Sequence, residues 1–226
     1  TSIDSMGWTI WLHCAVLTRV LAQQDAFHDE ARDGRLQMTA EDRYKYWEKT
    51  YSDPRAEAGK DWYGAWAEFQ IDVAGPAFRK SDEILVVGCG NSNLPSDLAQ
   101  QGFSVVGMDY SKNVIQLQRQ RFPDLNWVVA DLRRMPRFKD KSFDIVIEKA
   151  LMDGEGAFRE WPLMFSEISR VLRPGGRFIS ISLGQPEELN TELFFRNSSY
   201  GWTVQYALSY DNYYVYTMTK HPEAQP

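Results

Sequence analysis

Apolar and polar residues are arranged along the middle of the chain in a way that predicts a parallel β-sheet. Short runs of consecutive apolar residues, such as Ile84–Gly88, recur between longer segments of mixed character. A run that is apolar at every position is typical of a strand buried on both faces, as in parallel sheets covered by helices. The intervening segments have the length and periodicity of helices, so we expect strands and helices to alternate, with right-handed crossovers.

The expected elements can be placed by residue number. Strands are expected at 84–88, 104–108, 126–130, 143–148 and 177–182, and helices at 94–101, 113–121 and 158–172. Gly102 and the Arg173-Pro174-Gly175-Gly176 turn would end the first and last of these helices.

Further elements are expected on both sides of this region. Residues 41–51 indicate a short helix with Thr39 as its N-cap, and residues 62–79 a helix broken near Gly75-Pro76. The tail alternates over 201–208 and 213–219, which is typical of a hairpin. We therefore predict an α/β fold with a doubly wound, mostly parallel, seven-stranded sheet. The C-terminal hairpin would add an antiparallel edge.

Composition excludes several classes of protein. Of the 226 residues, 43% are hydrophobic and 14% aromatic, which excludes a wholly disordered chain. The net charge of −6 argues against a nucleic-acid-binding protein. The two cysteines, Cys14 and Cys89, are too few for a disulfide framework, and the histidines do not cluster at metal-ligand spacing. We expect no metal site and no nucleic-acid partner, and leave open whether the compartment is cytoplasmic or mitochondrial.

Residues 1–40 form a separate N-terminal segment of helical character. Its most apolar part, residues 6–21, is interrupted by His13 and Arg19 and is too short to span a membrane as a helix. An apolar face of this size is expected to dock onto a stable protein partner. We thus divide the chain into an extension (1–40), a catalytic domain (41–220) and a tail (221–226), with no transmembrane helix.

Candidate chemistry begins in the turn after the first expected parallel strand. Gly88-Cys89-Gly90-Asn91 follows an apolar strand and precedes a helix, and glycine there lets the backbone approach a ligand closely. Asp109 ends the next strand nineteen residues after Gly90, where a carboxylate pairs with the hydroxyls of a ribose. Asp131 follows the third strand and is placed to accept from an adenine amino group. A dinucleotide dehydrogenase shares the glycine turn but does not predict Asp131, the Pro-Gly-Gly turn and the hairpin together.

These motifs together resemble the class I S-adenosylmethionine (SAM)-dependent methyltransferases. Longer pieces resemble one subfamily, which includes elongation factor 1-alpha lysine methyltransferases, methyltransferase-like 13 N-terminal domains and, more loosely, citrate synthase lysine methyltransferase. The resemblance covers roughly 44–220 and rests on YWEKTY (46–51), DWYGAW (61–66), ILVVGCGNSNL (84–94), MDYS (108–111), SFDIVIEK (142–149), SEISRVLRPGGRFISIS (166–182) and SYGWTV (199–204).

The resemblance implies roles for individual residues. The cofactor would be SAM, bound by Trp47, Tyr51 and Trp62 at its methionine end, by Gly88, Cys89, Gly90 and Asn91 beneath it, by Asp109 and Tyr110 at the ribose, by Asp131 and Leu132 at the adenine, and by Lys149 at the mouth of the site. Lys149, Glu148 and Asp153 are the candidate catalytic residues. Aromatic faces and carboxylates suit a sulfonium cation.

Structural alternatives exist for several of these residues. Trp47 and Tyr51 are spaced i,i+4 and could be ordinary core aromatics, as could Trp62. Glu148 and Lys149 could form a surface pair, and Asp153 could be a helix N-cap. The chain also has EKALMDG at 148–154 where the family has EKGTLDA, which alters the region that shapes the acceptor site.

The function expected from the sequence is SAM-dependent methylation of a protein lysine, with an elongation factor as one candidate substrate. The lysine must lose its proton before it can attack, because its ordinary pKa is about 10.4. One alternative is a methyltransferase-like subunit of a larger assembly, docked through residues 1–40. Another is a small-molecule methyltransferase.

Overall fold

The computed structural model describes residues 38–53, 60–67, 78–153, 160–183, 198–208 and 213–222. The chain divides into two compact units, Thr1–Met38 and Thr39–Pro226, and the described residues belong almost entirely to the second. The predicted helical extension, its partner surface and Cys14 lie outside the described residues.

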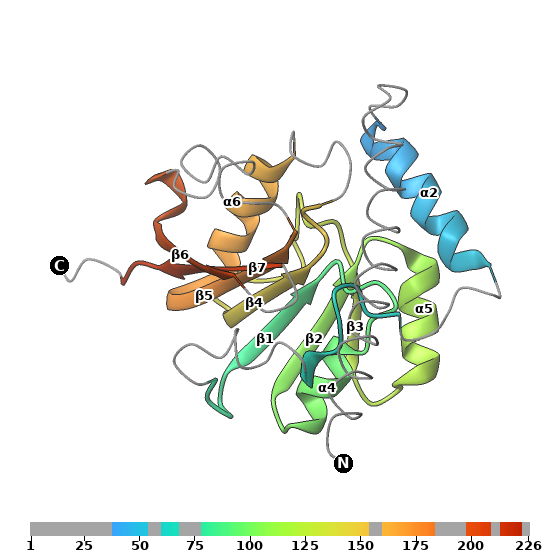
Figure 1. The fold of residues 1–226 in the computed structure, drawn as a ribbon, viewed down its shortest axis with the longest axis horizontal. Coiled ribbons are helices and arrows are strands. Elements are labelled where there is room, and N and C mark those ends of the chain that lie inside the picture. Colours follow the sequence, from blue (N-terminus) through green and yellow to red (C-terminus); the bar gives the residue numbers. More distant parts are fainter. Residues whose placement is uncertain are drawn as a thin grey trace, which may run out of the picture. The chain divides into compact units, whose positions relative to one another are not determined.

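A seven-stranded sheet forms the centre of the second unit (Figure 1). Its strands are β1 (Glu83–Val87), β2 (Ser104–Asp109), β3 (Asn126–Val129), β4 (Phe143–Lys149), β5 (Leu172–Ser182), β6 (Trp202–Leu208) and β7 (Tyr214–Lys220), in the order β3-β2-β1-β4-β5-β7-β6. The first five strands are parallel, and β7 is antiparallel to both β5 and β6. The predicted fold class is therefore confirmed.

Helices cover both faces of the sheet, as the apolar strands require. They are α2 (Ala40–Ser52), α4 (Leu94–Gln100), α5 (Lys112–Arg121) and α6 (Trp161–Val171), with a 3-10 turn at Ser198–Tyr200. Side chains of α4 and α5 share one core with Ile84, Val86 and Ile145, whereas those of α6 share the other with Leu85 and Val146. Alternate residues of β1 thus pack in opposite layers.

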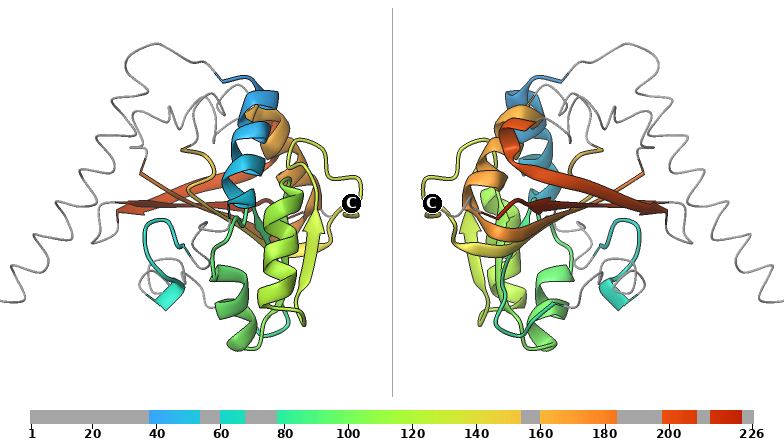
Figure 2. Two further views of the ribbon diagram at one scale, coloured as in Figure 1. Left: turned by 90° about the vertical axis from the view of Figure 1, so that its right-hand side faces the viewer. Right: turned by 90° about the vertical axis from the view of Figure 1, so that its left-hand side faces the viewer.

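Local sequence explains where the helices that frame the site begin. Thr39 and Asp42 form a capping box at α2, in which the Thr39 side chain accepts from the Asp42 amide and the Asp42 side chain accepts from the Thr39 amide. Ser111 caps α5 by accepting from the Val114 amide. Helix α2 lies beside α5 (Figure 2), where the Asn113 side chain donates to the backbone oxygen of Glu48 at 2.9 Å. This contact fixes α2 next to the carboxyl end of β2.

Two predicted boundaries were wrong. Residues 60–65 do not begin a helix, because Trp62 and Tyr63 lie in a turn in which Tyr63 and Gly64 have φ values of 63° and 110°. Strand β5 begins at Leu172, not residue 177, and its register against β4 shifts between Phe143 and Ile145. The shift accommodates Gly175, whose φ of 77° suits glycine. None of the described helices is both long and apolar enough to cross a membrane.

Candidate active site

The predicted site residues gather where the strand order reverses. Strand β1 is flanked by β2 on one side and β4 on the other. The chain builds the sheet from β1 through β2 to β3 in one direction, and then crosses to β4 and continues to β5 in the other direction. A crevice forms outside the carboxyl ends of the strands at such a point, and ligands of open α/β sheets bind there. Gly88 follows β1, and Asp109 and Lys149 are the last residues of β2 and β4.

The glycine turn after β1 requires both of its glycines. Gly88 and Gly90 have φ values of 58° and 50°. A Cβ on Gly88 would lie 2.9 Å from Leu151 side-chain carbons, and one on Gly90 would lie 2.8 Å from the Tyr51 hydroxyl. The turn therefore needs glycine both for its backbone conformation and for close approach by neighbouring side chains.

Helix α5 holds the same turn from behind. The buried Gln118 amide donates to the backbone oxygens of Gly90 and Ser92 at 3.0 and 2.8 Å, and Arg121 donates to that of Asn91 at 3.0 Å. Cys89 is buried and its pKa is raised well above its ordinary value by burial, so it is kept as a neutral thiol.

Asp109 is buried among backbone donors. Its carboxylate accepts from the Gly90 amide at 3.0 Å and from the Ser111 amide at 2.9 Å. Burial raises its pKa to about 6, although these amide hydrogen bonds act in the opposite direction. The carboxylate thus connects the end of β2 to the glycine turn.

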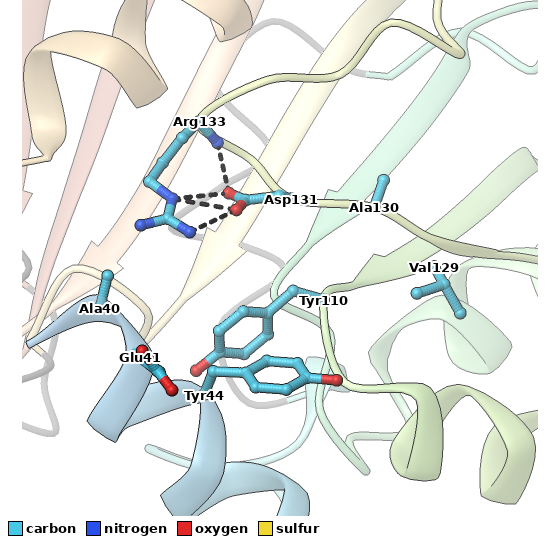
Figure 3. Close-up of a pocket in the computed structure, with 8 residues that line it drawn as sticks. All are labelled: Ala40, Glu41, Tyr44, Tyr110, Val129, Ala130, Asp131 and Arg133. Carbon is cyan, nitrogen blue, oxygen red and sulfur yellow. Dashed lines mark hydrogen bonds and ion pairs between the residues drawn. The ribbon is translucent and has the colours of Figure 1, made fainter.

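A pocket of about 430 Å³ opens beside Asp109, between α2 and the end of β3 (Figure 3). It is lined by Ala40, Glu41, Tyr44, Tyr110, Val129, Ala130, Asp131 and Arg133. The rings of Tyr44 and Tyr110 meet edge to face with centroids 5.5 Å apart. Leu132 is not among the lining residues, because its side chain packs into the core shared with α6.

A chain of ion pairs crosses the rim of this pocket. Arg133 forks onto the Asp131 carboxylate, with Nε 2.9 Å from Oδ1 and Nη2 2.5 Å from Oδ2. Its Nη1 also donates to Glu160 at 2.8 Å, and Glu160 accepts from Arg43 of α2 at 2.5 Å. Burial alone would raise the pKa of Asp131, but the hydrogen bonds from Arg133 outweigh it and lower that pKa. The ion pairs link α2 to the segment that follows β3.

The three predicted aromatic residues separate into two groups. Trp47 and Tyr51 stack on one face of α2 with centroids 5.5 Å apart, and the Tyr51 hydroxyl lies over Gly90. Trp62 lies on the segment before β1, is 37% exposed and holds the Lys60 ammonium 4.5 Å from its ring centroid. Trp47 and Tyr51 therefore belong with the glycine turn, whereas Trp62 lies at the surface.

The last residues of β4 lie at the other end of the crevice. Glu148 has no exposed surface, accepts from the Ser180 hydroxyl and accepts from the Leu151 amide at 2.9 Å. Burial, followed by the charge of Asp153, raises its pKa to about 8. Lys149 donates to Asp61 at 2.9 Å and to the backbone oxygen of Gly64 at 2.8 Å. The alternative of a surface pair for Glu148 and Lys149 was wrong.

Asp153 faces the segment that carries Trp62. Its carboxylate accepts from the Tyr63 hydroxyl at 2.8 Å and from the Ser182 hydroxyl at 2.5 Å. Burial raises the pKa of Tyr63, so its hydroxyl stays a donor. The alternative of a helix N-cap concerns residues 154–159, which lie outside the described residues.

Sequence reasoning missed five residues of this site: Asp61, Tyr63, Gln118, Arg133 and Glu160. Asp61 and Tyr63 belong to the DWYGAW piece, from which only Trp62 was selected. Arg133 was not selected, although its spacing of two residues from Asp131 allows the pair. Nothing local to Glu160 or Gln118 indicates partners 26 or more residues away.

Known proteins with similar sequences are methyltransferases. Residues 85–180 match the family model described as "Methyltransferase domain". EEF1A lysine methyltransferase 4 from Bos taurus is 33% identical over 198 residues, which cover 79% of this chain and 76% of the relative. The human eEF1A lysine and N-terminal methyltransferase is 32% identical over 173 residues, which cover 71% of this chain but 24% of that longer protein.

Solved structures share the fold at lower identity. One neighbour, from the complex of the Haloferax volcanii Trm112 methyltransferase activator with a methyltransferase, has a TM-score of 0.61 at 17% identity and covers 77% of this chain and 97% of that one. A SAM-dependent methyltransferase from Methanosarcina mazei has a TM-score of 0.52 at 22% identity, with coverages of 65% and 95%. The chain therefore belongs to the class I SAM-dependent methyltransferases, in the family that includes EEF1A lysine methyltransferase 4.

Proposed function

We propose that this methyltransferase transfers a methyl group from SAM to a lysine side chain of a protein, with eEF1A as the favoured substrate. The observation that carries the proposal is the 33% identity with EEF1A lysine methyltransferase 4 over 198 residues. A match of that extent includes both the glycine turn and the segment after β4. Relatives that match over a smaller part of their length are also named for eEF1A lysine methylation.

The residues at the carboxyl edge of the sheet fit SAM. The Asp109 carboxylate suits the ribose hydroxyls, and Tyr110 and Asp131 line a pocket of a size and polarity suited to adenine. Trp47 and Tyr51 stand beside Gly90 and are assigned to the methionine end, with Gly88, Cys89 and Asn91 forming the floor of the turn. Leu132 supports the adenine pocket from the core, and Trp62 and Lys149 belong to the mouth of the site.

When bound, SAM supplies a methyl group activated by a sulfonium cation, and the protein must supply a neutral amine aligned with it. Asp153 is the carboxylate we assign to the acceptor amine, because it is partly exposed and is oriented by the hydroxyls of Tyr63 and Ser182. Glu148 has no exposed surface and holds the turn at 150–152, so we assign it to positioning that turn. Desolvation of the amine in the crevice lowers its pKa and favours the neutral form.

The test is methyl transfer from SAM with a labelled methyl group to purified eEF1A, followed by mass spectrometry of the product. We expect a lysine side chain to gain mass, and Asp109→Ala to abolish the signal. Tight SAM binding without methyl transfer to eEF1A would show that eEF1A is not the substrate. Transfer to a small amine in preference to any protein would support the small-molecule alternative, and absence of all transfer the accessory-subunit alternative.

A further inference from the structure

A short segment, residues 60–67, crosses the reversal point of the sheet, and we call it the strap. Its Asp61 accepts from the Ser92 hydroxyl and, at 3.4 Å, from the Asn93 amide, both in the loop that follows β1. The same carboxylate accepts from Lys149, the last residue of β4, at 2.9 Å. Because β1 and β4 are the strands on either side of the crevice, Asp61 connects its two walls.

The ion pair between Asp61 and Lys149 is buried, so its contribution to stability differs from that of an exposed ion pair. The exposed fractions of the two side chains are 10% and 4%. Removing two charges from water costs free energy that their attraction offsets only in part, so a buried pair is weak evidence of stabilisation. Such a pair does fix geometry, because each charge must meet the other in one arrangement. Lys149 also donates to the backbone oxygen of Gly64, which adds a second point of attachment on the strap.

The strap also positions the Tyr63 hydroxyl beside Asp153, the carboxylate assigned to the acceptor amine. Tyr63 has a φ of 63° and Gly64 one of 110°, so the chain turns sharply between the two attachments. The turn directs the Tyr63 hydroxyl to Asp153 at 2.8 Å, and the Tyr63 ring stacks on that of Tyr213, with centroids 6.5 Å apart. Asp61 and Tyr63 therefore connect the end of β4 to the carboxylate assigned to the acceptor amine.

We propose that Asp61 is a positioning residue: through Lys149 it fixes the strap, and the strap holds Tyr63 against Asp153. In this arrangement Lys149 acts through Asp61, which gives it a positioning role besides the cofactor contact that the resemblance implies. The inference rests on the proposed function for its consequence, because the acceptor is a protein lysine. The attachment of the strap itself can be measured without any acceptor.

The experiment uses the full chain with Asp61→Asn, Lys149→Met and the double variant. Either single variant leaves one buried charge without its partner, so we expect its melting temperature to fall by several degrees; the double variant removes both charges and should recover most of the loss. Hydrogen exchange at the amides of residues 60–67 should be faster in all three variants. Methyl transfer to eEF1A should fall about tenfold in kcat in Asp61→Asn, while the SAM affinity of that variant stays within about threefold of the parent.

The control is Asp140→Asn, which makes the same substitution in the exposed pair between Asp140 and Arg170. It should leave strap exchange and transfer unchanged. A double variant that recovers slow exchange would overturn the proposal, as would an Asp61→Asn variant that keeps full kcat. If the parent fails to methylate eEF1A but strap exchange responds as expected, the substrate is wrong and the role of Asp61 stands.

Discussion

Asp109 and Asp131 lie at the ends of neighbouring strands, yet the protein surrounds their carboxylates with opposite electrostatics. Asp109 is 5% exposed and its described partners include two backbone amides and no cation. Its pKa is raised to about 6 by burial. The Asp131 side chain is 39% exposed and is forked by Arg133, whose hydrogen bonds lower its pKa. The Asp109 carboxylate is oriented by backbone amide dipoles in a buried environment. The Asp131 carboxylate is oriented by the positive charge of Arg133 at the rim of the pocket.

Because of this difference, the two ends of the cofactor site should respond to different solution conditions, namely pH and salt. A carboxylate held by dipoles can be protonated near neutral pH, so acidity controls the ribose end through Asp109. A carboxylate held by a guanidinium stays ionised, but its pair is weakened by salt. We therefore expect the ribose end to respond to pH and the adenine end to ionic strength.

The largest expected effect follows from removing the Asp109 carboxylate. Asp109→Ala should abolish measurable SAM binding, a loss of more than about a hundredfold, because charge-assisted hydrogen bonds to the ribose hydroxyls disappear. The sequence alone predicts little loss of fold. In the structure, however, the substitution would leave the Gly90 and Ser111 amides without the Asp109 acceptor, at a cost of about 1–3 kcal/mol of stability for each amide.

Calorimetry with SAM and thermal unfolding would measure the two effects of Asp109→Ala separately. Asp109→Asn is the matched control, since it keeps an acceptor oxygen for one of the two amides and loses the charge. Parent-like SAM affinity in the alanine variant would show that the ribose is bound elsewhere.

Glu148 is a second buried carboxylate, and it lies at the end of the site assigned to the acceptor. Its pKa in the folded protein is raised from 4.5 to about 8, so the folded state binds the proton more tightly than the unfolded state does. Stability from this group is present below pH 4.5 and falls as the pH rises toward 8. Glu148→Gln should therefore stabilise the protein at pH 9 by a few kcal/mol, on the order of what such a shift implies, and change little at pH 4.5.

Urea unfolding of parent and Glu148→Gln at pH 4.5, 7 and 9 would measure this difference. The isosteric amide keeps a donor and an acceptor for Ser180 and the 150–152 turn. A stability difference that is the same at every pH would mean that the carboxyl is not protonated in the folded protein.

SAM affinity itself should depend on pH through Asp109. Between pH 7 and pH 5 the affinity should fall about tenfold, because a carboxyl with a pKa of about 6 loses its charge over that range. Asp131 stays ionised throughout and contributes no slope. Calorimetric titrations at both pH values would show the fall in the parent and its absence in Asp109→Asn. A slope that persists in the variant would assign it to another group.

Trp47 and Trp62, both assigned to the methionine end of the cofactor from the sequence, differ in exposure. Trp47 is half-buried on Tyr51, whereas Trp62 is an exposed neighbour of Lys60. Trp47→Ala should weaken SAM binding by about 1–2 kcal/mol and Trp62→Ala by less than about 0.5 kcal/mol. Calorimetry on both variants, with circular dichroism for the fold, distinguishes them. Equal losses, or unfolding of Trp47→Ala, would favour the alternative of plain core packing for Trp47.

Sequence reasoning succeeded where one local pattern has one physical cause. The apolar run at 84–87 identifies β1 because a strand buried on both faces needs apolar residues at successive positions. Thr39 and Asp42 identify the start of α2 because a capping box is made by residues three apart. The mostly parallel seven-stranded sheet follows from alternating strands and helices with a terminal hairpin.

It failed where a side chain's role depends on distant partners. Glu148 was a candidate for a surface pair because its sequence neighbours do not reveal Ser180, which lies on the adjacent strand. The turn at Tyr63 was predicted as helix because the attachments of its segment, Lys149 and Asp153, come about ninety residues later. Long-range polar contacts override local periodicity, and they concentrate at the site.

The smallest expected effect concerns the ion pairs at the adenine end. Glu160 lies between Arg43 and Arg133, so Glu160→Gln leaves two guanidinium groups facing each other without the charge that separates them. SAM affinity should fall about threefold at low salt, in line with a partly exposed pair worth about 0.5–1 kcal/mol. Salt screens the interactions in the parent, so the two affinities should converge as the ionic strength rises toward 1 M. Calorimetry at several salt concentrations measures this, with Asp140→Asn as an equally conservative control elsewhere on the surface. A deficit that does not change with salt would mean that Glu160 acts through the packing of α6 and not through charge, and the contrast between a pH-sensitive and a salt-sensitive end of the site would then fail.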